Sequence, residues 1–158
     1  MSIQKVRAYF AQFDMAQRIL EFPVSSATVE LAAQALGCEG KRIVKTLAFQ
    51  GPSGPVLIAT AGDAKVDNAK YKAYFGGKAK MLSHDDAATL IGHAVGGVCP
   101  FALPENVSVY CDESLKRFET VFPAAGTSNS AVEMTPDELF EISGAKDWVK
   151  ICDLPTAE

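Results

Sequence analysis

Two apolar segments joined by a short turn constrain the fold of this chain more than any other feature. Residues 42–49 and 55–61 have the composition of β-strands, and the link between them contains Gly51, Pro52 and Gly54. Glycine and proline supply the backbone angles that tight turns need, so the segment predicts a β-hairpin. Part of the protein is therefore expected to be an antiparallel sheet.

Lys45 interrupts an apolar face of the first of these strands. Side chains alternate along a strand, so Ile43, Lys45, Leu47 and Phe49 share one face. Lysine is rarely buried without a partner. In one interpretation its stem lies along the sheet and its ammonium reaches water. In the other, the ammonium lies at the base of a pocket, where it can orient and polarise a carbonyl or a phosphate.

The remaining elements predict a single domain covering residues 1–158. Thr135 and Glu138 match a helix capping box, and Asp67 and Ser83 are suited to cap two more helices. The expected strands follow one another rather than alternating strictly with helices, which favours a mixed α+β fold over a doubly wound one. We therefore expect a mixed, largely antiparallel sheet flanked by helices. Further helices are expected at 2–13 and, capped by Ser25 or Ser26, at 27–36; further strands are expected at 107–112, 119–125, 130–134 and 147–153.

The composition is that of a soluble globular protein. Of the 158 residues, 48% are hydrophobic and 22% are charged. No apolar run approaches the roughly 20 residues that span a bilayer, and polar residues interrupt the apolar N-terminus, so we expect neither a membrane segment nor a signal peptide. Four cysteines without a C-x-x-C pair and two lone histidines predict reduced thiols in a cytoplasmic protein and no metal site.

A lysine-rich segment contrasts with the net charge of −4. Between positions 65 and 80 the only acid is Asp67, and Tyr71, Tyr74 and Phe75 lie among the lysines. A local charge of about +4 predicts contact with a phosphate backbone at one place, while the total charge argues against broad nonspecific binding. The alternative is a solvated helix face whose lysines confer solubility. The lysines are Lys65, Lys70, Lys72, Lys78 and Lys80.

Two glycine-containing loops supply further candidates. In AVGGVCPFALP, Gly96 and Gly97 permit unusual backbone angles and Pro100 stiffens the far side, so several N–H groups can face one oxygen. The same pattern is also common in ordinary turns. In AAGTSNSA, Gly126 precedes three polar residues between two expected strands. A turn is the simpler interpretation there, and a polar pocket wall is the alternative.

In this order and spacing, the segments resemble the YbaK/ProX family of trans-editing aminoacyl-tRNA deacylases. That family is related to the editing domain inserted in bacterial prolyl-tRNA synthetases. The resemblance runs from about Ser25 to Leu139. It rests on IVKTLAF around Lys45, GDAKVD at 62–67, the Gly-x-x-x-Pro loop 96–100 followed by Phe101, and AAG at 124–126.

The resemblance implies a compact mixed sheet flanked by helices and no metal or organic cofactor. It also implies hydrolysis of the ester that joins a wrong amino acid to the 3′-terminal adenosine of a tRNA. Lys45 matches the lysine on which activity in the family depends, and it would position the aminoacyl-adenosine. A water, helped by the neighbouring ribose hydroxyl, would attack in place of a side-chain nucleophile. The loop that would hold the aminoacyl carbonyl and ribose comprises Gly96, Gly97, Val98, Cys99 and Pro100, followed by Phe101.

Other residues acquire expected roles from the same resemblance. Gly126 matches a family glycine, and Thr127, Ser128 and Asn129 become candidate pocket contacts. The expected ligand is the acceptor end of an aminoacyl-tRNA, above all tRNA-Pro carrying a small amino acid such as Ala or Cys. Prolyl-tRNA synthetase is a further candidate partner, and the likeness favours a monomer. Acceptor-stem phosphates would be contacted by Lys65, Lys70 and Lys72, with Tyr71 or Tyr74 for stacking.

Cys99 departs from the family pattern, in which Ser or Thr often precedes the loop proline. Cysteine is more apolar and a weaker hydrogen-bonding partner, so the pocket is expected to prefer a small aliphatic or sulfur-bearing side chain. Cys99 also suggests a different mechanism, because His93 lies six residues earlier and can activate a thiolate.

Two other function classes remain open from the sequence. A non-catalytic module that binds aminoacyl-tRNA ends or a synthetase would use the same residues. A metal-dependent hydrolase has little support, because the histidines and cysteines lack the spacing of metal ligands.

Overall fold

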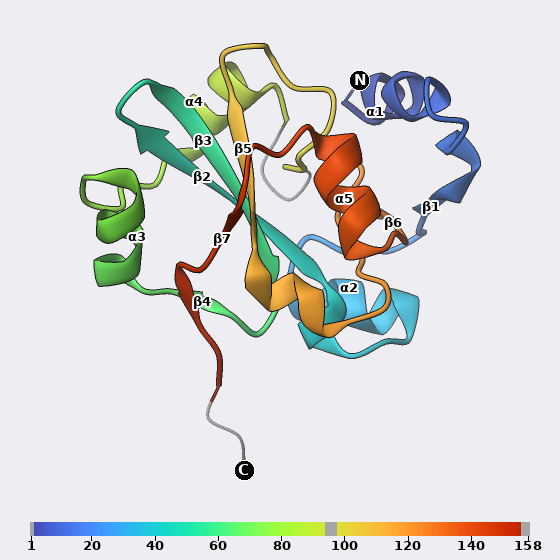
Figure 1. The fold of residues 1–158 in the computed structure, drawn as a ribbon. Coiled ribbons are helices and arrows are strands. Elements are labelled where there is room, and N and C mark those ends of the chain that lie inside the picture. The colour runs from blue at the N-terminus through green and yellow to red at the C-terminus, as the bar shows by residue number, and fades with distance from the viewer. Residues whose placement is uncertain (1, 94–97, 156–158) are drawn as a thin grey trace.

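A four-stranded sheet forms the centre of the computed structural model, which describes residues 2–93 and 98–155. Its strands stand in the order β2-β3-β5-β7 (Figure 1). β2 and β3 form the predicted hairpin and pair antiparallel, whereas β3 with β5 and β5 with β7 pair parallel. The strands are β2 (Val44–Gly51), β3 (Gly54–Ala61), β5 (Ser108–Asp112) and β7 (Trp148–Val149).

Two short antiparallel sheets adjoin the central one. β1 (Ile19–Glu21) pairs with β6 (Ser130–Val132), and β4 (Lys65–Val66) pairs with β8 (Cys152–Asp153). Among the strand pairings in the described part of the chain, three of five are antiparallel. The expectation of a mixed, largely antiparallel α+β fold is confirmed.

Helices begin at the side chains that the sequence marks as caps. Asp67 and Ser83 accept hydrogen bonds from backbone N–H groups of the helices that follow them, and Thr135 forms a complete capping box with Glu138. The helix expected after Ser25 or Ser26 begins later, because Thr28 is its cap. The α-helices are α1 (Ser2–Ala11), α2 (Val29–Leu36), α3 (Asn68–Phe75), α4 (His84–Ile91) and α5 (Pro136–Ser143); the 3₁₀ turns are η1 (Ala16–Arg18), η2 (Gly40–Arg42) and η3 (Glu113–Arg117).

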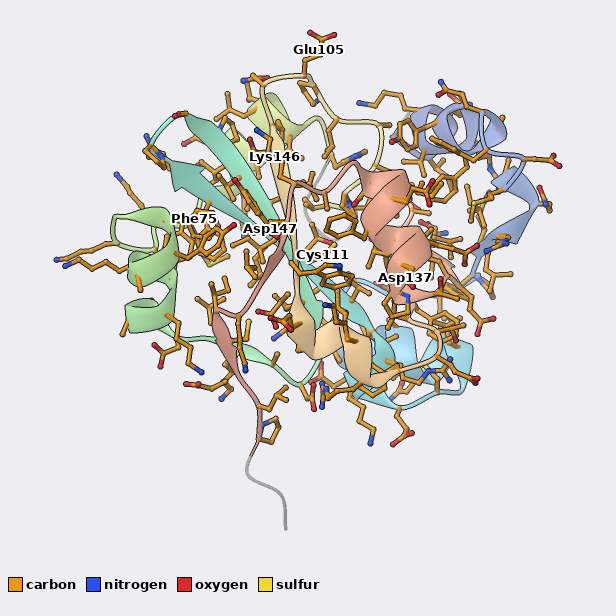
Figure 2. All side chains as sticks on the ribbon, viewed as in Figure 1. Phe75, Glu105, Cys111, Asp137, Lys146 and Asp147 are labelled. Carbon is orange, nitrogen blue, oxygen red and sulfur yellow. The ribbon has the colours of Figure 1, made fainter. Side chains whose placement is uncertain are left out.

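The two faces of the sheet are covered by different helices. On one face, α3 packs its rings onto the sheet: the ring centroids of Phe49 and Tyr71 are 5.0 Å apart, and those of Phe75 and Tyr110 are 5.1 Å apart. Figure 2 shows Phe75 pointing from α3 toward the strands. On the other face, Ala48 of β2 belongs to a buried cluster that includes Ile91 of α4. None of the helices in the described ranges is long and apolar enough to cross a membrane.

Two expected strands form differently from the prediction. Residues 119–125 make only isolated bridges, Ile43 with Phe122 and Val121 with Met134, and Pro123 has no N–H with which to continue a ladder. Residues 147–153 divide into β7 and β8, which pair with different strands. The buried carboxylate of Asp112 accepts the backbone N–H of Ile151 at 3.0 Å, which holds the chain where it leaves one sheet for the other.

Candidate active site at the edge of the sheet

A cavity of about 300 Å³ lies along the outer strand of the central sheet. Five consecutive residues of the β2 region, 43–47, line it, so both faces of the strand contribute, as is possible only at a sheet edge. The opposite wall comes from residues 26–29 and Ala32, which precede and belong to α2. The remaining lining residues are Phe122, Ala124, Ser130 and Ala131.

Lys45 lines this cavity, and its ammonium is held by the protein instead of extending into bulk water. The side chain is partly buried, and its Nζ donates a hydrogen bond to the backbone carbonyl of Ala64. Burial lowers the pKa of Lys45, and the nearby Cys152 and Asp63 partly oppose that shift. An ammonium has three donors, and the described residues accept only one of them. Lys45 is therefore anchored by one bond, and within the described residues its other two donors are open to a ligand or to solvent.

Thr46 brings a second polar group to the same edge. Its hydroxyl oxygen is buried and has no hydrogen-bond partner among the residues that the structure describes. Thr46 also lines the cavity. A buried hydroxyl without a partner costs about 1–3 kcal/mol, and such groups commonly mark positions where a ligand or water completes the site.

The predicted contacts at 127–129 support a cavity wall and do not line it. The side chain of Asn129 donates to the carbonyl of Phe22 at 3.0 Å, and the carbonyl of Ser128 accepts the N–H of Ser26 at 2.6 Å. Thr127 donates to Ser130 at 2.8 Å, next to the buried Gly126. The first two bonds fix residues 22–26 against the turn that leads into β6.

The glycine-proline loop is only partly described. Gly96 and Gly97 lie outside the described residues. Val98 is partly buried and packs against the cluster that contains Ala48. Cys99, Pro100 and Phe101 are buried, and none of residues 98–101 lines the cavity. Phe101 instead packs edge-on against Phe10 of α1, at 4.7 Å between ring centroids.

Cys99 and His93 meet in the core but do not form a nucleophile and base. The Cys99 sulfur lies 3.6 Å from Nε2 of His93, and that same nitrogen lies 2.8 Å from the carbonyl oxygen of Phe101. Because a carbonyl only accepts, Nε2 carries the hydrogen and cannot take one from the thiol. Burial raises the pKa of Cys99 to about 12 and lowers that of His93. Both shifts oppose a thiolate–imidazolium pair.

The candidate tRNA-binding lysines differ in their surroundings. Lys65 and Lys72 are exposed, whereas Lys70 is bound to Asp153 at 2.6 Å. The expected stacking role of Tyr71 is wrong, because that ring is buried among Phe49 and Phe75. Tyr74 remains 45% exposed and donates its hydroxyl to Asp147 at 2.8 Å.

The sequence around this cavity matches a known protein family. The family model of the aminoacyl-tRNA editing domain matches residues 24–142, which include the whole cavity. The chain belongs to the aminoacyl-tRNA editing domain family. The resemblance recognised in the sequence is thereby confirmed.

Relatives of this editing domain include free-standing proteins and part of a synthetase. An uncharacterized protein of Bacillus subtilis (strain 168), YwhH, is 50% identical over 153 residues, covering 96% of this chain and 98% of that protein. Proline–tRNA ligase of Thermosipho melanesiensis is 34% identical over 104 residues, which are 65% of this chain but only 18% of the ligase. A solved structure described as a candidate trans-editing enzyme for prolyl tRNA synthetase superposes with a TM-score of 0.87 at 30% identity, covering 96% and 97% of the two chains.

Some residues of the site escaped the sequence interpretation. Thr46 follows Lys45 directly, but its neighbours in the sequence do not indicate that its hydroxyl is buried without a partner among the described residues. Asp63 lies within the motif GDAKVD, but no role followed from it. Its partner Arg117 is 54 residues away, and no motif around Arg117 indicates that it contacts Asp63. These roles depend on contacts between distant segments.

Proposed function

We propose that this editing domain is a trans-editing aminoacyl-tRNA deacylase, which hydrolyses the ester of a mischarged tRNA. The observation that carries the proposal is the anchored ammonium of Lys45 at a small, mostly apolar cavity within a chain of the editing family. A fixed cation at the wall of such a cavity can orient the aminoacyl-adenosine and stabilise charge that develops on an oxygen.

Lys45 and the glycine-proline loop have complementary roles in this proposal. Lys45 positions the 3′ end, while backbone N–H groups of the loop 96–101 stabilise the carbonyl oxygen under attack. The position of Val98 supports this arrangement. It packs on the cluster containing Ala48, which lies two residues, or about 7 Å, along the strand from Thr46. Thr46 and Ala48 share one face of β2, so Val98 packs on a cluster that includes a residue of the same face as Thr46.

Water is the proposed attacking group, helped by the ribose hydroxyl beside the ester. Hydroxyl side chains do line the cavity, but a serine or threonine nucleophile requires an adjacent base. Within the described lining no histidine or carboxylate is present, and Lys45 is the only ionisable side chain. An ammonium that donates to a carbonyl is poorly suited to accept a proton.

The proposed substrate is tRNA-Pro carrying a small amino acid such as Ala or Cys. A volume of about 300 Å³ lies at the lower end of the roughly 300–1,000 Å³ of ligand sites. Small and apolar residues, including Ala27, Ala124 and Ala131, form much of the wall. Kinship with part of a proline–tRNA ligase supports the choice of tRNA.

We place this activity in the cytoplasm, with the protein acting as a monomer and prolyl-tRNA synthetase as a candidate partner. The cysteines of the chain are all unpaired thiols, which suits a reducing compartment.

A deacylation panel tests the proposed function. Purified protein is mixed with tRNA-Pro charged with Ala, Cys, Ser or Pro, and release of the free amino acid is followed. Release of Ala or Cys in large excess over protein, with Pro-tRNA spared, supports a deacylase. Stoichiometric binding without release contradicts it and identifies a non-catalytic binding module.

A further inference from the structure

We propose that Asp63 and Arg117 form a positioning pair that sets the placement and the electrostatic environment of the Lys45 ammonium. The inference rests on the proposed function, since it assigns these residues to the same site. Neither residue lines the cavity. They act through the turn that carries the Ala64 carbonyl.

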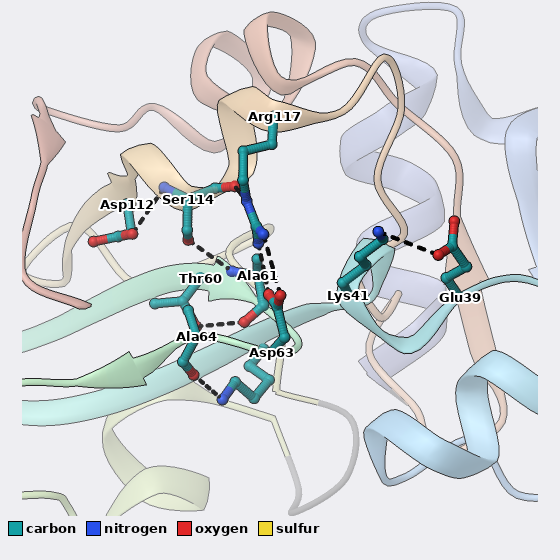
Figure 3. A network of polar contacts seen from close by, with 10 residues as sticks. Glu39, Lys41, Thr60, Ala61, Asp63, Ala64, Asp112, Ser114 and Arg117 are labelled. Atoms are coloured by element: carbon teal, nitrogen blue, oxygen red, sulfur yellow. Dashed lines mark hydrogen bonds and ion pairs between the residues drawn. The ribbon is translucent and has the colours of Figure 1, made fainter. Parts of the chain in front are cut away.

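The turn between β3 and β4 is what anchors Lys45. Its residues 62–64 follow the end of β3, where Figure 3 labels Asp63 and Ala64. The Ala64 carbonyl accepts a hydrogen bond from the Lys45 ammonium. The N–H of Ala64 in turn bonds the carbonyl of Ala61 at 3.1 Å. Any movement of this turn therefore displaces the acceptor on which the orientation of Lys45 depends.

Asp63 and Arg117 attach this turn to the η3 segment. The guanidinium donates two hydrogen bonds to the Asp63 carboxylate, at 2.6 and 3.1 Å, and a third to the carbonyl of Ser114 at 2.8 Å. Such a two-pronged pair fixes direction as well as distance. The turn is thus fastened at Asp63, directly before Ala64.

A second set of bonds fixes the base of the same turn. The Ser114 hydroxyl accepts the N–H of Ala61 at 3.1 Å, and the buried Asp112 accepts the N–H of Ser114 at 2.9 Å. Figure 3 shows these two bonds in series, from Asp112 to Ser114 and from Ser114 to Ala61. Because the base is held independently, loss of the Asp63–Arg117 pair is expected to loosen the turn without unfolding the domain.

The pair also sets the charge beside Lys45. The charged and titratable groups that act on Lys45 are Cys152 of β8, Asp63 of the turn, Lys65 of β4 and Glu30 of α2. Asp63 raises the pKa of Lys45, and Arg117 neutralises that carboxylate. Removing one partner leaves the other unneutralised, so the two removals act on Lys45 in opposite directions. An ion pair that does not act on the Lys45 ammonium predicts no such opposition, and the rate measurement below separates positioning from charge alone.

Two variants, D63N and R117Q, test the proposal in the full chain. The pKa of Lys45 is read from the ¹³Cε signal of labelled lysine, assigned by its absence in Lys45→Arg. We expect that pKa to fall in D63N and to rise in R117Q. With mischarged tRNA, we expect the maximal deacylation rate to fall about ten- to a hundredfold in both, while KM changes little. Asp63→Glu should recover part of the rate.

A matched control is Arg7→Gln, which breaks the exposed Arg7–Glu21 pair of α1 and β1. It should leave both the Lys45 titration and the rate unchanged. The proposal is overturned if D63N and R117Q shift the Lys45 pKa in the same direction or not at all, or if both retain the full rate. The titration needs no turnover, so an inactive wild-type protein would refute the proposed function while the positioning pair is still judged.

Discussion

Gly62 lies so close to Gly40 that a Cβ atom on Gly62 would fall 2.1 Å from the Gly40 carbonyl oxygen. The same atom would lie 3.0 Å from the carbonyl oxygen of Ile43. Both obstacles are backbone, which cannot rotate away as a side chain can. This contact brings the turn that anchors Lys45 against the segment that leads into β2, and only glycine permits it.

Gly62→Ala is therefore expected to separate the two segments. We predict a loss of about 1–3 kcal/mol in the free energy of unfolding, the usual cost of inserting a methyl group into a closed contact. We also predict a lower deacylation rate, because the Ala64 acceptor moves with the turn. Urea unfolding and a rate measurement check both parts. Gly77→Ala is the matched control, since its Cβ would have no neighbour within 4 Å.

We predict that the lysines proposed to contact tRNA contribute differently to tRNA affinity, because Lys70 has an ion-pair partner whereas Lys65 and Lys72 are exposed. Lys65→Glu or Lys72→Glu should weaken tRNA binding. Each should also reduce the magnitude of the slope of log K against log salt by about 1, which corresponds to the loss of one phosphate contact. Asp153→Asn should strengthen binding, because it releases Lys70 from its ion pair. The measurement is a binding titration at several salt concentrations.

The control for that series is Lys146→Glu, which makes the same charge change at an exposed position that does not line the cavity. An equal loss of affinity in this variant would show that only net charge matters. The contact surface proposed at Lys65 and Lys72 would then be wrong.

Cys99→Ala is predicted to retain deacylation within a few-fold, although it removes the only thiol near His93 in the described core. The reason is that the thiol is fully buried and its pKa is raised to about 12. Stability should fall by about 1 kcal/mol for the small cavity created. Complete loss of turnover in a folded Cys99→Ala protein would restore the thiolate mechanism.

Features set by neighbouring residues were predictable from the sequence. The caps Asp67 and Thr135 act within one helical turn, so their spacing alone located α3 and α5. The hairpin followed from its turn residues in the same way. The face of β2 that carries Lys45 was also predicted, since alternation is a property of the strand itself.

Features set by distant residues were not predictable. Ala64 accepts from Lys45 across 19 residues, and Arg117 reaches Asp63 across 54. The segment 119–125 had strand composition but found only single bridging partners. Likewise, the burial of Tyr71 depends on where α3 packs on the sheet, and the sequence of α3 alone does not determine that position.

The most direct test of the account is the deacylation rate of Lys45→Ala with mischarged tRNA-Pro, alongside Lys146→Ala. We predict that Lys45→Ala loses about a hundredfold or more in rate, the typical cost of removing one stabilising donor, while urea unfolding shows an intact domain. Lys146→Ala should match the wild-type rate. A folded Lys45→Ala protein that hydrolyses mischarged tRNA at the wild-type rate would contradict the central claim.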